Sequence, residues 1–390
     1  MKNSSSRGYL KKSALIFATL LFPFLILELG LRISNPSNPY YSQINREKYG
    51  PFSRYDSLIG WSGAPGGKFW DDDGHTSVLY VTNSEGYRDI EHEPLSNKPA
   101  VVFLGGSYPW GQYVKFDENF VEVLRHKLTD YEIYNFSFDC YGPDQDLLLF
   151  KRWSDQYKGQ IKLVVLTESK QDVRRVGVSS ECGMPKPKFD IVGNKLALTG
   201  VPVPRISKWQ SEDKKEPDQL TKTQQWKKSI KALLFHSYFL HALYDRIHEQ
   251  YSDFRYSLRK NPEVDADPVN SYVITDEDLA LTSKIFEELK KTVEARGAEL
   301  VIVFVPSKAN VQGLSDSEPY QDKIKPICVK LGIACIDPLQ DFIKSGRVTH
   351  RRSIGGHWTP DGHKIAAESI YNFLINDDEF NLHSKNTSSY

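Results

Sequence analysis

The stretch Val101-Val102-Phe103-Leu104-Gly105-Gly106-Ser107 is an apolar run that ends in two glycines and a serine. Its length and composition predict a buried strand that stops at the glycines. Reactive groups in open α/β sheets collect beyond the carboxyl ends of the strands, where Ser107 would lie. Ser107 is therefore a candidate nucleophile. In the alternative interpretation, it only caps the next helix or completes a tight Gly-Gly-Ser turn.

Apolar strands alternate with amphipathic helices from residue 100 onward. This alternation predicts an α/β fold with a parallel sheet and helices on both faces. A mixed-charge excursion over 185–268 interrupts the pattern, so we expect one domain split by an insertion. Asp117 is the expected cap of the first helix. The predicted strands are 101–104, 133–138, 161–167, 300–305 and 333–336, and the predicted helices are 116–128, 144–153, 229–250, 275–296, 320–331 and 361–374.

The composition excludes several classes of protein. Of the 390 residues, 39% are hydrophobic and 12% aromatic, which is enough for a sizeable core and argues against global disorder. The 50 basic and 50 acidic residues cancel, and outside the N-terminus no stripe of basic side chains is separated from acidic ones. We therefore expect no nucleic-acid partner.

The N-terminus has the pattern of a membrane anchor. Residues 1–12 carry four basic and no acidic side chains, and the segment 13–32 is apolar up to Glu28. Its length approaches the roughly 20 residues that a membrane-spanning helix requires. The charge asymmetry predicts a cytoplasmic N-terminus and a C-terminal domain on the periplasmic or extracellular side. The alternatives are a cleaved signal peptide, for which no small-residue cleavage site follows Leu27, and a buried core helix.

The predicted domain organisation follows from these segments. A cytoplasmic tail over 1–12 precedes the transmembrane anchor over 13–32. Residues 33–98 form a linker and a small β-rich lead-in, with a β-like piece at 77–81. The α/β domain occupies 99–378 with its excursion at 185–268, and 379–390 form a tail.

The four cysteines do not form a recognisable framework. They are Cys140, Cys182, Cys328 and Cys335, which is too few over this length to be read as a disulfide scaffold. Cys328 and Cys335 could meet if the helix over 320–331 turns back into the next strand. No Cys or His cluster has metal-ligand spacing, so we expect neither a metal site nor a cofactor.

A candidate base lies 250 residues after Ser107, in Gly356-His357-Trp358-Thr359-Pro360-Asp361-Gly362-His363. A serine hydroxyl needs a neighbouring base to become nucleophilic, and histidine is the usual one. His357 is the candidate, whereas His363 falls in the first turn of the following helix and is expected to be structural. In the alternative interpretation, His357 is a packed loop histidine beside Trp358. The pair predicts acyl transfer.

Polar or small residues follow three of the predicted strands, at 105–107, 139–142 and 167–172. Together with the His357 loop they would converge on one site. These segments resemble the SGNH/GDSL hydrolase superfamily, and more closely its bacterial membrane-anchored members. The resemblance covers roughly residues 14–175 and 275–375. Its parts are 28–32 (ELGLR), 60–61 (GW), 83–89 (NSEGYRD), 104–107 (LGGS), 135–145, 296–307 and 357–363 (HWTPDGH).

The resemblance implies a three-layer α/β/α domain and a set of site residues. Ser107 takes the position of the nucleophile and His357 that of the catalytic histidine. The family's oxyanion donors fall on the backbone N–H of Ser107, on the backbone N–H of Cys140, and on the side-chain amide of Gln171. No cofactor is implied.

The chain departs from the family pattern at four places. Gly106 replaces the aspartate of Gly-Asp-Ser, Cys140 replaces a glycine, and Gln171 replaces an asparagine. The family acid two or three residues before the histidine is absent, because Ile354 and Gly355 occupy those positions. Catalysis would then need a Ser–His dyad, or an acid supplied by Asp172, Glu168 or Asp361.

Two functional hypotheses follow. In the first, the chain is a membrane-anchored serine esterase or O-acyltransferase that acts on a cell-envelope glycan or lipid through Ser107 and His357. The resembled family includes proteins that acetylate secreted polysaccharides. In the second, it is a catalytically impaired relative that binds a glycan or a partner protein in exopolysaccharide assembly. The missing acid and the Cys140 replacement motivate the second hypothesis.

Overall fold

The computed structural model describes residues 19, 21–33, 53–72, 77–93, 97–205, 237, 239–240, 272–313, 319–351, 356–377, 380 and 382. The chain divides into two compact units. One comprises residues 1–48, 72–77 and 215–260, and the other comprises 49–71, 78–214 and 261–390. The second unit contains the central sheet and the candidate site.

The central sheet has five strands in the order β13-β12-β7-β5-β6, and all of its strand pairs are parallel. The chain runs from β5 outward to one edge at β6 and then returns to β7 on the other side of β5. The carboxyl end of β5 is therefore the switch point at which such folds bind ligands. The strands are β5 (Ala100–Leu104), β6 (Glu132–Asn135), β7 (Ile161–Glu168), β12 (Glu299–Phe304) and β13 (Ala334–Ile336).

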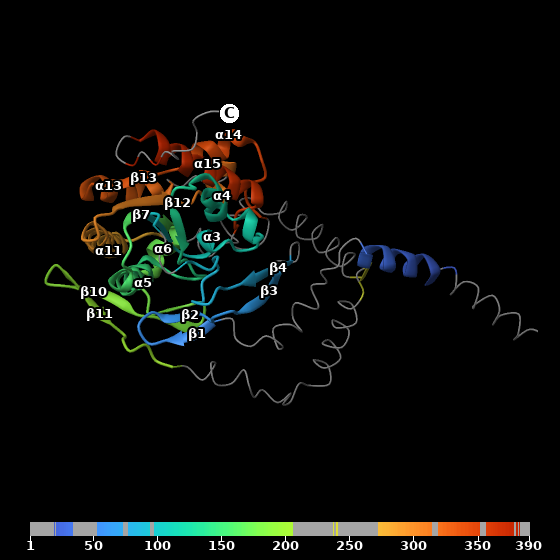
Figure 1. Cartoon of the computed structure of the whole chain (residues 1–390), viewed down its shortest axis with the longest axis horizontal. Helices are drawn as coiled ribbons and strands as arrows, with labels where there is room; N and C mark the ends of the chain where they lie inside the picture. Colours follow the sequence, from blue (N-terminus) through green and yellow to red (C-terminus); the bar gives the residue numbers. More distant parts are fainter. Residues whose placement is uncertain are drawn as a thin grey trace, which may run out of the picture. The chain divides into compact units, whose positions relative to one another are not determined.

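Helices cover both faces of the sheet, which confirms the predicted α/β fold (Figure 1). Alternate residues of β5 face opposite cores: Val102 and Leu104 belong to one, and Val101 and Phe103 to the other. One face is covered by α5 (Pro143–Gln156), α11 (Asp276–Glu294) and α13 (Tyr320–Leu331), and the other by α4 (Phe120–Lys127), α14 (Leu339–Ser345) and α15 (Pro360–Asn376).

The first helix begins later than its sequence pattern predicts. Residues 116–118 form a single 3-10 turn (η1, Phe116–Glu118), and α4 starts only at Phe120. Asn119, not Asp117, is the cap, because its Oδ1 accepts the backbone N–H of Val121 at 3.1 Å. The Asn119 amide also donates to the carbonyl of Pro109 at 2.7 Å, a tertiary contact that local sequence does not reveal.

Two antiparallel hairpins precede the sheet. They are formed by β1 (Ser53–Asp56) with β2 (Gly60–Gly63), and by β3 (Lys68–Asp72) with β4 (Ser77–Val81). The following turn carries Arg88, which is 1% exposed and donates to the carbonyls of Trp110, Gly111 and Val114. The lead-in therefore holds the end of α3 (Ser107–Trp110), the short helix that begins at the candidate nucleophile.

Part of the predicted excursion is ordered β-structure. Strands β8 (Ser180–Glu181) and β9 (Met184–Pro185) form one antiparallel hairpin, and β10 (Lys188–Val192) and β11 (Lys195–Thr199) form another. Phe189 of the second hairpin is buried in the core on the α5 and α11 side. The predicted helix over 229–250 lies outside the described residues except for 237, 239 and 240.

The described part of the predicted anchor is helical over 21–33. Among the described residues, none of the helices combines the length and the apolarity needed to cross a membrane. Residues 1–12, 13–18 and 20 lie outside the described part, so the anchor over 13–32 stays a prediction. Glu28 of this helix pairs with Arg32 and accepts hydrogen bonds from the Ser237 hydroxyl and the Phe239 backbone N–H.

All four cysteines are paired, which corrects the expectation that they form no disulfide framework. Cys140 and Cys182 are joined across 42 residues, with their Cα atoms 6.3 Å apart. Cys328 and Cys335 are joined where α13 turns back into β13, as the sequence allowed. The first pair was not foreseen because only the tertiary fold brings the β8–β9 turn to the end of β6.

Candidate active site

The nucleophile position is created by the turn that follows β5. Gly105 has φ +137, and a Cβ atom there would lie 3.0 Å from both the carbonyl oxygen of Thr167 and the Pro109 ring. Only glycine fits this close approach of strand, turn and ring without strain. The turn delivers Ser107 to the switch point as the first residue of α3. Its side chain does not cap the helix, for which Gly106 is the N-cap residue.

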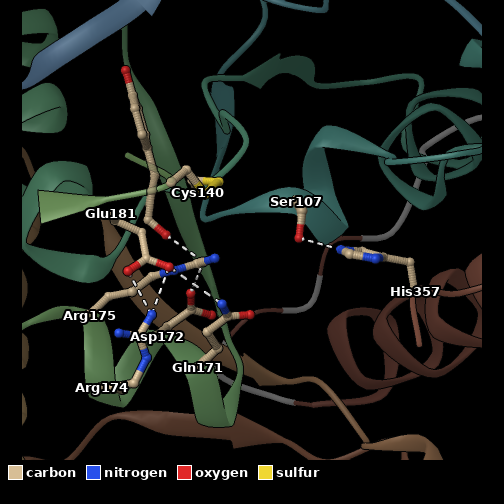
Figure 2. Close-up of a disulfide and its surroundings, with 10 residues drawn as sticks. Ser107, Cys140, Gln171, Asp172, Arg174, Arg175, Glu181 and His357 are labelled. Atoms are coloured by element: carbon tan, nitrogen blue, oxygen red, sulfur yellow. Dashed lines mark hydrogen bonds and ion pairs between the residues drawn. A yellow bond between two sulfur atoms is a disulfide. The ribbon is translucent and has the colours of Figure 1, made fainter. Parts of the chain in front are cut away.

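The structure brings Ser107 and His357 together. The Ser107 Oγ lies 2.8 Å from His357 Nε2, although 250 residues separate them in the chain (Figure 2). The His357 loop is held by the bridge between His350 and Trp358 and by the bond from the Arg351 N–H to the His357 carbonyl. With a proton on Nδ1, the His357 ring would accept the serine hydroxyl proton at Nε2, which is the geometry of a general base.

Two tyrosine rings flank the His357 imidazole. The ring centroid of Tyr108 lies 5.2 Å from it, and that of Tyr113 lies 5.6 Å away in an edge-on arrangement. Trp358, which is fully buried, packs edge-on against Tyr108. These contacts restrict the orientation of the imidazole by packing. The sequence offered no signal for the two tyrosines, because neither belongs to a motif.

His363 has the structural role expected of it. It is 1% exposed, its Nδ1 accepts the backbone N–H of Phe120 at 3.3 Å, and its ring stacks on the Phe120 ring. Burial lowers the pKa of His363 to about 3, so the ring is neutral at physiological pH. It supports α4 against α15 and does not contact Ser107.

Cys140 adopts a backbone conformation that is uncommon for a residue with a side chain. Its φ is +66, in the left-handed region that favours glycine. The Phe138 N–H donates to the Gly105 carbonyl, so the segment that contains Cys140 runs beside the serine turn. Within the described part of the chain, the backbone N–H groups of Ser107 and Cys140 donate to no other group. Both residues are buried, so these N–H groups are candidates for binding an oxyanion.

Gln171, the third predicted oxyanion donor, lies on α6 (Lys170–Arg175). Its Nε2 donates to Glu181 Oε1 at 3.4 Å, and Glu181 also pairs with Arg174 at 2.6 Å. In Figure 2, His357 lies on one side of Ser107, and Cys140, Gln171 and Glu181 lie on the other. Gln171 makes no hydrogen bond to Ser107. An oxyanion would use the second N–H of this amide or a rotated amide.

None of the three candidate acids hydrogen-bonds to His357. Asp361 pairs with Arg347, and Asp172 pairs with Arg175. Glu168 is fully buried, and within the described part of the chain neither of its carboxylate oxygens has a hydrogen-bond partner. Burial raises the pKa of Glu168 well above its ordinary value. The positions of Ile354 and Gly355 lie outside the described residues.

Arg175 and Asp172 lie against the backbone of Gly106. A Cβ atom on Gly106 would lie 3.0 Å from Arg175 Nη1 and 3.6 Å from Asp172 Oδ1. The Arg175 guanidinium also donates to the Tyr141 carbonyl at 2.9 Å. The Asp172–Arg175 pair therefore occupies the space behind the serine turn. Sequence reasoning missed Arg175 and Glu181, for which the only local signal is the Ser169-x-x-Asp172 capping box of α6.

A metal site is not found in the described residues, where no group of three or more His, Cys, Asp or Glu side chains could hold an ion. The chemistry that the residues present can support is proton transfer from Ser107 to His357, with backbone N–H groups nearby.

Comparisons with known proteins give similarity in structure only. No protein-family model and no curated protein matches the chain. It is similar to a crystal structure of a lipolytic G-D-S-L family member from Veillonella parvula, with 10% identity over 71% of this chain and 98% of that one, at a TM-score of 0.38. It is similar to TesA, with 11% identity over 70% and 97% and a TM-score of 0.37. The alpha/beta hydrolase LAE5, from the metagenome of Lake Arreo, has 10% identity over 75% and 99% and a TM-score of 0.37.

Proposed function

We propose that this chain is a serine esterase or O-acyltransferase of the SGNH/GDSL type, with Ser107 as nucleophile and His357 as general base. The observation that carries the proposal is the 2.8 Å contact between Ser107 Oγ and His357 Nε2 at the switch point of the sheet. A contact of this length between a hydroxyl and an imidazole is the signature of an activated nucleophile.

The proposed reaction has two stages. The Ser107 oxygen attacks the ester carbonyl carbon while His357 Nε2 takes the hydroxyl proton. The tetrahedral intermediate then collapses, and His357 returns that proton to the departing alcohol, which leaves an acyl group on Ser107. A water molecule, or the hydroxyl of an acceptor sugar or lipid, attacks the acyl-enzyme in the second stage. His357 takes its proton and gives it back to the Ser107 oxygen.

The negative charge of the tetrahedral intermediate needs donors on the side of Ser107 opposite to His357. The backbone N–H groups of Ser107 and Cys140 are without partners in the described part of the chain and are suited to this role. The Gln171 amide is the third candidate. One oxyanion donor is typically worth about 10²–10³ in rate.

The proposed setting is the cell envelope. The described helix over 21–33 leaves large apolar side chains exposed, including Phe22, Leu29 and Ile33 at 67%, 60% and 75%, and a membrane would cover such surfaces. Two disulfides favour a compartment outside the reducing cytoplasm. We therefore propose a single-pass protein whose catalytic domain faces the periplasm or the outside and whose substrate is an acylated glycan or lipid. Proteins of polysaccharide assembly are the proposed partners.

A serine-directed fluorophosphonate probe and short acyl esters test the proposal. We expect labelling of the intact protein at one serine, found by peptide mass spectrometry to be Ser107, together with ester hydrolysis. Ser107→Ala should abolish both. The matched control is Ser369→Ala, which removes a hydroxyl that donates to Asp341 of α14 and should retain both.

A second candidate function is binding without catalysis. It is favoured by two observations: the Gln171 amide donates to Glu181, and Asp361, Asp172 and Glu168 do not reach His357. In that case the chain would hold a glycan or a protein of exopolysaccharide assembly. If the intact protein is neither labelled at Ser107 nor able to hydrolyse short acyl esters, this second function replaces the first.

A further inference from the structure

The β8–β9 hairpin is attached to the oxyanion side of the site at two points. Cys182, in its turn, forms the disulfide with Cys140, whose N–H is a proposed donor. Glu181, the residue before Cys182, accepts from the amide of Gln171, another proposed donor. Figure 2 shows both attachments on the side of Ser107 opposite to His357. One short hairpin therefore contacts both residues at which this chain departs from the family's oxyanion pattern.

Cys140 needs such a restraint because of its conformation. A residue with a Cβ atom is disfavoured at φ +66, and the glycine of the family pattern would adopt this conformation without cost. Cys140 is 7% exposed and is tied through its side chain to Cys182. The disulfide holds the peptide at residue 140 from the side-chain direction, where a glycine would offer no attachment.

The hairpin itself is anchored by buried charges. Glu181 is 8% exposed and pairs with Arg174 and with Arg175, which in turn donates to the carbonyl of Tyr141, the neighbour of Cys140. At the other end of the hairpin, the fully buried ammonium of Lys186 pairs with Asp144 and donates to the Arg175 carbonyl. A covalent route therefore connects the hairpin to residue 140, and an ionic route through Arg175 connects it to the neighbouring residue 141.

We infer that the β8–β9 hairpin is a positioning element for the oxyanion side of the Ser107 site, and that its Cys140–Cys182 disulfide makes turnover dependent on the redox state of the surroundings. The inference rests on the proposed function. Cys140 and Glu181 act through the groups that they hold, the residue 140 N–H and the Gln171 amide. The Ser107–His357 contact does not involve the hairpin and remains after reduction.

The reduction has a defined chemistry. A phosphine such as tris(2-carboxyethyl)phosphine supplies two electrons, the sulfur–sulfur bond breaks, and water provides the oxygen of the phosphine oxide and the protons of the two thiols. The exposed sulfur-bearing residue is Cys182, whereas Cys140 is buried. The phosphine therefore reaches the bond from the hairpin side.

The experiment uses the full chain with Cys328→Ser and Cys335→Ser, so that Cys140–Cys182 is the only bond available to reduce. Steady-state ester hydrolysis is measured before and after phosphine treatment, with mass spectrometry to count the free thiols. We expect kcat to fall about tenfold or more, because a misplaced oxyanion donor acts on the transition state, while KM changes by less than about threefold. Cys182→Ser should reproduce the reduced state without phosphine.

A second pair of variants separates positioning from folding. Glu181→Ala removes the acceptor of Gln171, whereas Glu181→Gln retains a carbonyl oxygen at that point. We expect Glu181→Ala to lower kcat and Glu181→Gln to restore most of it, with both variants retaining a cooperative thermal transition.

The outcomes are distinguishable. If oxidised protein is labelled at Ser107 and turns over, but kcat stays within twofold when two free thiols have appeared, this inference is wrong and the proposed function stands. A rise in KM alone also overturns it. If oxidised protein is neither labelled nor active, the proposed function fails and this inference fails with it.

Discussion

On the His357 side of Ser107, the serine and histidine side chains meet in one hydrogen bond, and the surroundings only restrict their orientation. On the opposite side, Cys140 and Gln171 are both bound to the β8–β9 hairpin. The difference follows from what each side must supply. Proton transfer requires particular functional groups, whereas an oxyanion requires only N–H groups in the right place.

A backbone N–H is present in every residue except proline, so its position can be maintained in more than one way. A glycine achieves the conformation at residue 140 by having no side chain, and this chain achieves it with a side chain that is covalently held. The His357 side offers no such freedom. The largest effects on activity should therefore come from the Ser107–His357 pair, and smaller ones from the opposite side.

The strongest test of this contrast is removal of the reacting side chains. Ser107→Ala should reduce kcat/KM for a short acyl ester by about 10⁴-fold or more, and His357→Ala by a similar factor. The double variant should lose little beyond either single variant, because the two groups act as a unit. Steady-state kinetics measures all three. Additive losses would show that Ser107 and His357 do not cooperate in one step.

The Cys140–Cys182 disulfide, which attaches the hairpin to the site, can be compared with the Cys328–Cys335 disulfide, which lies outside the site. Cys140 and Cys182 are 42 residues apart, and Cys328 and Cys335 are 7 apart. Loss of loop-closure entropy in the unfolded chain predicts stabilisation of about 4 kcal/mol for the longer loop and about 2 to 3 kcal/mol for the shorter one. Urea denaturation of the two double-serine variants measures both. Only the variant without Cys140–Cys182 should also have a lower kcat. A larger loss of stability in the variant without Cys328–Cys335 would contradict the prediction from loop length.

His363 serves as a comparison for His357, because it is a histidine that does not belong to the Ser107–His357 pair. Its pKa is lowered to about 3, so its contribution to stability is present above the unfolded value of about 6.5 and is lost as the pH falls towards 3. Between pH 6.5 and 4, we expect the wild type to lose about 3 kcal/mol more unfolding free energy than His363→Asn, which still offers Phe120 an acceptor.

The measurement for His363 is urea unfolding at pH 7 and at pH 4 for both proteins. Equal losses for wild type and variant would show that His363 does not remain neutral in the folded chain. Ester hydrolysis at pH 7 should change far less in His363→Asn than in His357→Ala, because His363 does not contact Ser107.

At Gln171 we expect a smaller loss of activity than at Ser107 or His357. Gln171→Ala should lower kcat by about 10- to 100-fold, somewhat less than the loss of a full oxyanion donor, because two backbone donors remain. The control is Gln340→Ala, which removes an exposed amide on α14. Thermal melting should be unchanged in both. A kcat for Gln171→Ala equal to that of the control would remove Gln171 from the site.

Local sequence predicted a strand or helix well where the residues of that element alone specify its conformation. The strand over 101–104 and the helix over 320–331 appear as expected, and α11 lies within the helix expected over 275–296. The predicted helix start at residue 116 was wrong: α4 begins only after Asn119, whose amide is bonded to the Pro109 carbonyl of another turn. The strand expected over 133–138 ends at Asn135, although Phe136 and Phe138 still donate to carbonyls at the end of β5.

The candidate site was predictable to a similar extent. The serine after a strand and the histidine loop could be named from sequence, because each carries its own local pattern. Arg175 and Glu181 could not, since their roles depend on which segments lie against the Gly105–Gly106 turn. The pairing of Cys140 with Cys182 was hidden for the same reason.

By itself, the sequence determined the alternation that makes a parallel α/β sheet, and it placed a hydroxyl at one strand end and an imidazole in a distant loop. These properties follow from periodicity and residue type, which are local. Only the tertiary structure decided that the two side chains meet at 2.8 Å, that a hairpin from the excursion is bonded to residue 140, and that Gly106 makes room for an ion pair. Those contacts join segments tens to hundreds of residues apart, and no local pattern records which of them pack together.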